Sequence, residues 1–135
     1  AALGDLVRLE GYTLVQGDQP VTFTEIGPSQ PFTLTLYWRS LETLHDTYHI
    51  FVHVQAPDES MLAASDGPPQ EGAYPTMIWD AGELVATTHT LTLPPEAAAF
   101  TVHAGLYRWP DLTRLSVVQD GERTPDGRVI LWPLP

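Results

Sequence analysis

The feature that most constrains the fold is an alternation of apolar and polar residues with a period of two. In the segment 32–39, Leu34 and Leu36 alternate with Thr33 and Thr35. Successive side chains of a β-strand point to opposite faces, so this pattern predicts a strand with one buried face. The same alternation occurs in three further segments, 48–55, 85–93 and 100–107.

The apolar positions of these four segments predict one shared hydrophobic core. No window of 11 or more residues shows the 3.6-residue period of an amphipathic helix, so the core is expected to lie between sheets. We expect it to contain Phe32, Leu34, Leu36, Trp38, Ile50, Val52, Val54, Leu91, Leu93, Val102, Ala104 and Leu106.

Shorter apolar segments complete a set of eight or nine expected strands. The 13 prolines and 10 glycines are scattered along the chain, which is typical of many short elements joined by turns. This organisation predicts a single domain over 1–135, an antiparallel β-sandwich that is Ig-like or jelly-roll-like. A closed barrel is the alternative. The shorter segments are 6–15, 21–26, 61–65, 115–118 and 129–132.

Charge and cysteine content limit the partners of the chain. Six arginines, no lysine and 17 acidic residues give a net charge of −11. Such a surface repels phosphate backbones, so nucleic acid is not an expected partner. The absence of cysteine excludes disulfides and thiolate metal sites. No run of 18 apolar residues is present, so a membrane link is expected only through an upstream region.

A longer pattern of residues resembles a known family. It consists of Leu36-Tyr37-Trp38, Phe51-Val52-His53, Asp66-Gly67-Pro68-Pro69, Tyr74-Pro75-Thr76, Trp79, Gly82-Glu83, Leu91-Thr92-Leu93-Pro94 and Gly105-Leu106-Tyr107. Over roughly residues 3–118, the chain resembles a β-sandwich domain found at the C-terminal end of bacterial multi-pass membrane glycosyltransferases and related membrane proteins. The end of the chain, 123–135, departs from the family pattern, which leaves the register of the closing strand open.

The resemblance implies a setting and a role. It implies a noncatalytic accessory domain on the extracytoplasmic side of a bacterial membrane, excised from a longer membrane protein that is itself glycosyltransferase-like. Two alternatives remain. The domain is purely structural or binds another protein, or it is a small glycoside hydrolase that uses two acidic residues of one loop. No nucleophile elbow, phosphate-binding loop or zinc-protease motif is present in the sequence.

The histidines do not predict a metal site. His45, His49 and His53 are spaced four residues apart, and in a helix their side chains would lie on one face. The surrounding residues are β-branched and aromatic, so a strand is expected, and His49 and His53 would then lie about 13 Å apart. One zinc ion cannot bind both at that separation.

We expect His53 to face away from the core and to form a hydrogen bond with a neighbouring carbonyl or carboxylate. No cofactor is expected, with calcium bound by loop carboxylates as the alternative.

The long irregular segment 66–82 is the candidate binding region, because a loop of this length in a compact domain is functional or disordered. If the domain binds a small molecule, the sequence predicts a carbohydrate or glycosyl acceptor. Aromatic rings would stack on the sugar, and carboxylates and histidine would bond its hydroxyls. Packing into the core edge is the alternative for the aromatic rings. The candidate residues are His53, Asp66, Tyr74, Trp79, Asp80 and Glu83.

Overall fold

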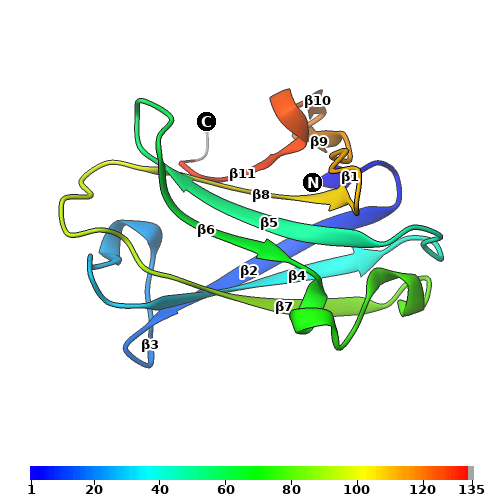
Figure 1. The fold of residues 1–135 in the computed structure, drawn as a ribbon, viewed down its shortest axis with the longest axis horizontal. Helices are drawn as coiled ribbons and strands as arrows, with labels where there is room; N and C mark the ends of the chain where they lie inside the picture. The colour runs from blue at the N-terminus through cyan, green and yellow to red at the C-terminus, as the bar shows by residue number, and fades with distance from the viewer. Residues whose placement is uncertain (134–135) are drawn as a thin grey trace.

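The chain folds into two antiparallel β-sheets packed face to face. A computed structural model describes residues 1–133. One sheet has seven strands and the other has four (Figure 1). The predicted antiparallel β-sandwich is therefore confirmed. Because the sheets are separate and keep open edges, the closed barrel is not formed.

The larger sheet has the strand order β10-β9-β1-β2-β4-β7, with β3 paired to β2. The smaller sheet has the order β11-β8-β5-β6. The bounds in the larger sheet are β1 Ala2–Leu3, β2 Val7–Gln16, β3 Gln19–Pro20, β4 Phe32–Ser40, β7 Leu84–Leu91, β9 Val117–Gln119 and β10 Glu122–Arg123. Those in the smaller sheet are β5 Tyr48–Gln55, β6 Met61–Gly67, β8 Thr101–Arg108 and β11 Val129–Trp132.

Short 3₁₀ turns are the helical elements of the described part of the chain. None of the helices within residues 1–133 has the length and apolar character needed to cross a membrane. The turns are η1 Phe23–Glu25, η2 Pro69–Gly72, η3 Thr76–Ile78 and η4 Pro125–Gly127.

The core lies between the two sheets, as the alternation predicts. All twelve predicted core residues are buried, with exposed fractions of 4% or less. Trp38 contributes the largest of these side chains, and its indole Nε1 donates a hydrogen bond to Thr87 Oγ1 on the neighbouring strand β7 at 2.9 Å. The one polar atom of the ring is therefore satisfied inside the core.

The strand prediction differs from the structure in two places. The segment 21–26 contains the turn η1 instead of a strand. The Glu25 carboxylate accepts a hydrogen bond from the Thr22 backbone N–H at 2.8 Å, a local bond that competes with a sheet ladder. The structure also has eleven strands instead of eight or nine, because β1, β3 and β10 are only two residues long and show no periodicity.

The C-terminal strand closes the smaller sheet. β11 pairs antiparallel with β8, and the register shifts between Ile130 and Trp132. This settles the register that the sequence left open, and the final residues 134 and 135 lie outside the described part.

Two features of the sandwich position the functional residues. On one side, the edge strands β6 and β7 face each other across the open edge of the sandwich (Figure 1). On the outer face of the smaller sheet, residues that follow β8 fold back over the strands. The Arg114 guanidinium lies 4.2 Å from the centre of the Phe51 ring, and Phe51 is 1% exposed. Gly105 is required beneath this ring, because a Cβ there would lie 2.5 Å from Phe51 Cε2.

Candidate functional site

The predicted binding loop divides into two halves with different roles. Residues 66 and 67, predicted to be irregular, are the last residues of strand β6, and with the turn η2 they line a cleft. Residues 74–83 fold back on themselves and pack against the end of the sandwich. The candidates Asp66 and Glu83 therefore belong to different surroundings. The second half contains four of the six predicted candidates: Tyr74, Trp79, Asp80 and Glu83.

Trp79 is buried, which contradicts its predicted role as a surface ring for sugar stacking. Its side chain is 1% exposed, and its Nε1 donates to the Tyr74 backbone carbonyl at 3.0 Å. The neighbouring Thr76 is also fully buried; its hydroxyl accepts from the Tyr48 N–H at 3.0 Å and donates to the Asp46 carbonyl at 3.1 Å. The indole fills the space between this loop and the core, and burial of a large ring stabilises a small domain more than exposure would.

Tyr74, Asp80 and Glu83 form a local network that closes the same half of the loop. The Tyr74 hydroxyl donates to Glu83 Oε2 at 2.5 Å, and the Asp80 N–H donates to Glu83 Oε1 at 2.8 Å. The hydrogen bond to Glu83 raises the pKa of Tyr74 to about 12 and lowers the pKa of Glu83. Both oxygens of Glu83 are thus engaged within the loop.

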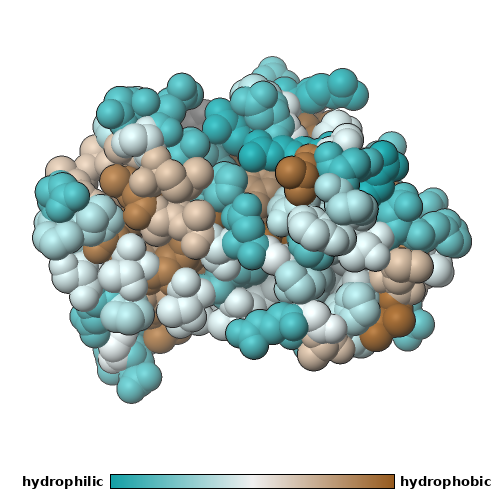
Figure 2. All heavy atoms as spheres, in the orientation of Figure 1, coloured by the Kyte–Doolittle hydropathy of each residue, from teal (hydrophilic) through white to brown (hydrophobic). Residues whose placement is uncertain are grey.

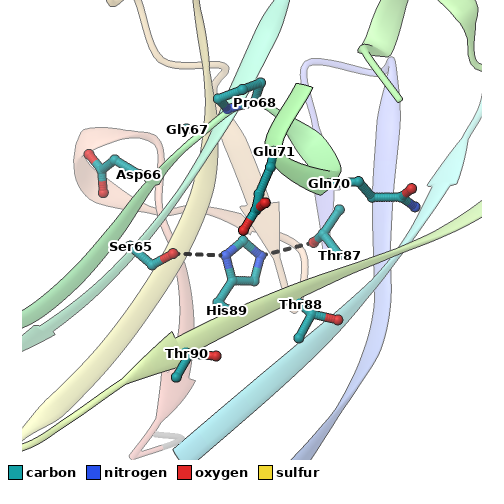
Figure 3. A pocket seen from close by; sticks show the side chains of 10 residues that line it. All are labelled: Ser65, Asp66, Gly67, Pro68, Gln70, Glu71, Thr87, Thr88, His89 and Thr90. Carbon is teal, nitrogen blue, oxygen red and sulfur yellow. Dashed lines mark hydrogen bonds between the residues drawn. The ribbon is translucent and has the colours of Figure 1, made fainter. Parts of the chain in front are cut away.

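The first half of the loop lines a polar cleft between the edge strands, here called the β6–β7 cleft (Figure 3). Its volume is about 480 Å³, within the range of small-molecule sites. Hydroxyl, amide, carboxylate and imidazole groups dominate its walls. The lining residues are Ser65, Asp66, Gly67, Pro68, Gln70, Glu71, Thr87, Thr88, His89 and Thr90.

His89 lies at the base of this cleft and connects the core to the cleft wall. Its Nε2 is 2.9 Å from Thr87 Oγ1, and its Nδ1 is 3.2 Å from Ser65 Oγ (Figure 3). The side chain is 8% exposed, and burial lowers its pKa to about 4, so the imidazole is neutral near pH 7. His89 is therefore a buried polar residue at the edge of the core.

The proton of neutral His89 can be assigned from its partners. The Trp38 indole is a donor only, so Thr87 Oγ1 accepts from it and has its own hydrogen left to donate. Donation to His89 Nε2 satisfies that hydrogen and places the ring proton on Nδ1. His89 then donates to Ser65 Oγ, and the Ser65 hydroxyl hydrogen is free to donate into the cleft.

Gln70 and Glu71 adopt strained backbone conformations beside the cleft. Their φ angles are 51° and 58°, the left-handed region that residues with a Cβ rarely adopt. The turn directs the Gln70 amide to the edge of β7, where Nε2 donates to the Ala86 carbonyl at 3.1 Å. The Glu71 carboxylate points into the cleft above the His89 ring (Figure 3). Such strain costs on the order of 1–3 kcal/mol per residue and is concentrated at functional sites.

His53 and Asp66 lie together on the outer face of the smaller sheet. His53 Nε2 is 3.1 Å from Asp66 Oδ1, the carboxylate partner that the sequence predicts for this histidine. Burial lowers the pKa of His53, and Asp66 opposes that shift. The Asp66 side chain points away from His89 in the view of the cleft (Figure 3), although the residue also lines that cleft.

His103 lies opposite His53 on the neighbouring strand β8. It is 7% exposed, and its Nδ1 has no hydrogen-bond partner among residues 1–133. Burial, with a contribution from nearby Arg128, lowers its pKa to about 4. Residues 1–133 contain no group of three or more His, Asp or Glu side chains arranged to hold a metal ion.

Sequence reasoning missed the polar residues of β7 and the end of β6. Ser65, Gln70, Thr88 and Thr90 line the cleft, yet hydroxyl and amide residues match no catalytic or metal-binding motif. One signal was available, since the Thr-rich sequence of β7 directly follows the long loop. The cleft lies between two edge strands of different sheets, β6 and β7, and their proximity cannot be read from either strand alone.

Comparison with known proteins supports the fold. No family model matches the sequence, and no curated protein matches it. The structure is similar to a solved structure described as the C-terminal domain of wzt, with a TM-score of 0.65 and 11% sequence identity. The similarity covers 81% of this chain and 66% of the other, so the chain spans just under two thirds of its length. A likeness at this level of identity concerns the fold alone.

Proposed function

We propose that this chain is a noncatalytic accessory domain that binds carbohydrate in the β6–β7 cleft. The observation that carries the proposal is the cleft itself: about 480 Å³ of space lined by hydroxyl, amide and carboxylate groups. Sugars present many hydroxyls, and each can donate one hydrogen bond and accept others. Ser65 supplies a fixed donor and Glu71 an acceptor, which matches both functions of a sugar hydroxyl.

The same groups argue against hydrolysis. Nucleophilic catalysis by Ser65 would need a base that takes its proton, but the assigned His89 donates to Ser65 and accepts from Thr87. Glycoside hydrolysis needs two carboxylates on either side of the sugar. Glu71 points into the cleft, whereas Asp66 points away from it (Figure 3). Binding without turnover is the function that this arrangement supports best.

The setting of the domain is also proposed. The sequence resemblance supports a glycosyltransferase-like bacterial membrane protein as the parent, with the domain on the extracytoplasmic side. Complete sequencing of the gene tests the parentage, and protease accessibility in intact spheroplasts tests the side. An adjoining glycosyltransferase region and cleavage by external protease are the expected results.

Binding is expected to be weak, because the cleft is open and its contacts are polar. Dissociation constants in the millimolar to high-micromolar range, about −4 to −6 kcal/mol, are expected.

The test of the proposed function is a glycan array of mannose, galactose, glucose, rhamnose and N-acetylglucosamine oligosaccharides, followed by calorimetry on the strongest hits. Ser65→Ala removes the hydroxyl that donates into the cleft and should weaken binding. Thr13→Val, which removes a hydroxyl on strand β2 away from the cleft, is the matched control. Equal binding by parent and Ser65→Ala would contradict the proposal.

A second candidate function is protein interaction, which the other half of the loop favours. Met77 and Ile78 in the turn η3 are 50% and 55% exposed, and Leu84 nearby is 46% exposed. Figure 2 shows apolar surface atoms at the end of the molecule where Figure 1 places η3. Exposed apolar side chains at one end of a domain are typical of an interaction site. Substitution of Met77 and Ile78 by serine would abolish partner binding under this alternative and leave glycan binding unchanged under the first.

A further inference from the structure

The outer face of the smaller sheet carries a row of stacked rings beside the cleft. Trp109 is 49% exposed and stacks on His49, with ring centres 4.6 Å apart and planes 10° apart. His49 in turn meets Tyr107 edge to face at 5.6 Å. Trp109 therefore presents an exposed ring that is held in place by its contact with His49. An exposed aromatic ring suits the apolar face of a sugar ring, and the packing fixes it before binding.

The row leads to a small hollow lined by Asp66, Tyr107, Leu112 and Arg114, here called the outer-face hollow. Two charged side chains in it are held by neighbours. Arg114 Nη1 donates to the Asp126 carbonyl at 3.0 Å while its guanidinium lies over the Phe51 ring. Asp66 is positioned by His53. The hollow thus offers one fixed anionic acceptor and one fixed cationic donor.

The hollow is too small to act as an independent site. Its volume is about 170 Å³, below the roughly 300 Å³ at which small-molecule pockets begin. It lies next to the β6–β7 cleft, because Asp66, at the end of strand β6, lines both. The next residue, Gly67, has no side chain, and the space that a Cβ would face is empty. A ligand that crosses the end of strand β6 at Gly67 would therefore meet no side chain of that residue.

We propose that the outer-face hollow is a second sugar subsite, so that the domain binds an oligosaccharide that crosses the end of β6 at Gly67. This proposal rests on the proposed function and extends it from a single sugar to a chain of sugars. One residue of the ligand occupies the β6–β7 cleft, and another occupies the outer-face hollow with its ring against Tyr107. The Asp66 carboxylate accepts from one ligand hydroxyl, and the Arg114 guanidinium donates to its neighbour.

The chemistry of the hollow selects a neutral sugar. An acidic sugar would place its carboxylate beside Asp66 in the hollow and near Glu71 in the cleft, on a chain whose net charge is −11. Among residues 1–133, Arg114 is the one cation that lines the hollow, and the two carboxylates outnumber it, so an acidic sugar is repelled on balance, whereas a pair of neighbouring hydroxyls can bond both Asp66 and Arg114. The ligand class is therefore a neutral oligosaccharide.

The test measures affinity against ligand length. Mono-, di-, tri- and hexasaccharides of the five array sugars are titrated into the parent, Arg114→Gln, Tyr107→Phe and the cleft variant Ser65→Ala. Arg123→Gln, an exposed arginine on β10, is the control for loss of one positive charge. The parent should bind the trisaccharide more tightly than the monosaccharide. Arg114→Gln should weaken binding of the trisaccharide by about ten- to a hundred-fold, the effect of one hydrogen bond to a charged group. Tyr107→Phe keeps the ring that stacks on the sugar, so its affinity for the trisaccharide should fall less.

The outcomes separate this inference from the proposed function. If affinity is independent of length, or if Arg114→Gln retains the full gain with length, the second subsite is overturned, while loss of binding in Ser65→Ala leaves the cleft standing. If Ser65→Ala binds every length as the parent does, the cleft is overturned. If no sugar on the array binds the parent, both are overturned. Circular dichroism of each variant confirms that the sheets are intact.

Discussion

The two halves of the 66–83 loop use their residues in opposite ways. Residues 74–83 contain the large aromatic side chains of the loop, and their functional groups contact other protein groups. Trp79 is 1% exposed, and both Glu83 oxygens accept hydrogen bonds within the loop. Residues 66–71 hold smaller polar side chains on a strained backbone that opens onto a cleft. The difference shows that aromatic residues in a long loop stabilise its shape, while the polar residues beside them remain available to a ligand.

The largest effect on stability is expected when the Trp79 side chain is removed. Trp79→Ala should destabilise the domain by about 3–5 kcal/mol, because it leaves a cavity and an unpaired Tyr74 carbonyl. Trp109→Ala, at an exposed ring, should cost less than about 1 kcal/mol. Urea unfolding followed by circular dichroism measures both. Equal costs for the two variants would contradict the assignment of the second half of the loop to packing.

The next effect is acid destabilisation through the two buried histidines. Burial lowers the pKa of His89 and of His103 to about 4, whereas an unfolded histidine titrates near 6.5. As pH falls, the unfolded chain binds these protons first. The stabilising contribution of the neutral rings is therefore complete above about pH 6.5, decreases down to about pH 4, and is absent below it. Each histidine accounts for on the order of 3 kcal/mol.

Thermal unfolding between pH 7.5 and pH 4 checks this effect. A variant with His89→Gln should lose stability less steeply over that range, although it is less stable at pH 7.5. A variant with exposed His45→Gln is the control and should follow the parent. If His89→Gln and the parent have parallel pH profiles, His89 is not buried in neutral form.

A smaller change in stability shows whether backbone strain or side-chain packing dominates at Glu71 beside the cleft. Glu71→Gly should stabilise the domain by about 1 kcal/mol, because glycine adopts a φ of 58° without the steric cost of a Cβ. The same change removes the carboxylate that points into the cleft and should weaken glycan binding. Chemical unfolding and calorimetry on one protein sample measure the two effects. A loss of stability in Glu71→Gly would mean that Glu71 is held by packing rather than by strain.

The smallest effect is a local titration in the second half of the loop. The Glu83 carboxylate raises the pKa of the Tyr74 phenol to about 12, above its ordinary value of 10.0. In Glu83→Gln the same phenol should titrate closer to 10, since the anionic acceptor is gone. Ultraviolet difference absorbance of the parent, Glu83→Gln and Tyr74→Phe identifies the transition. An unchanged Tyr74 transition in Glu83→Gln would show that the two side chains are not bonded in solution.

The sequence predicts the sandwich well and the site poorly, for physical reasons. Burial imposes a period of two on residues such as Leu34 and Ile50, so the core can be read directly from the chain. A short strand such as β3 is too brief to show any period. Trp79 illustrates the difficulty at the site, because an indole suits a sugar-binding surface and a packed loop equally well. The cleft depends on which edge strands meet, and that long-range contact leaves no local signal.

The most direct test of the central claim is a ¹H–¹⁵N NMR titration of the parent with the trisaccharide that binds best on the array. Ligand in the β6–β7 cleft should shift the backbone signals of Ser65, Gly67, Gln70 and Thr88 in a saturable way. The indole Nε1–H signal of Trp79 should stay in place, because that group is buried and bonded to Tyr74. Saturable shifts centred on Trp79 and residues 74–83, with no change at Ser65 and Thr88, would contradict the account.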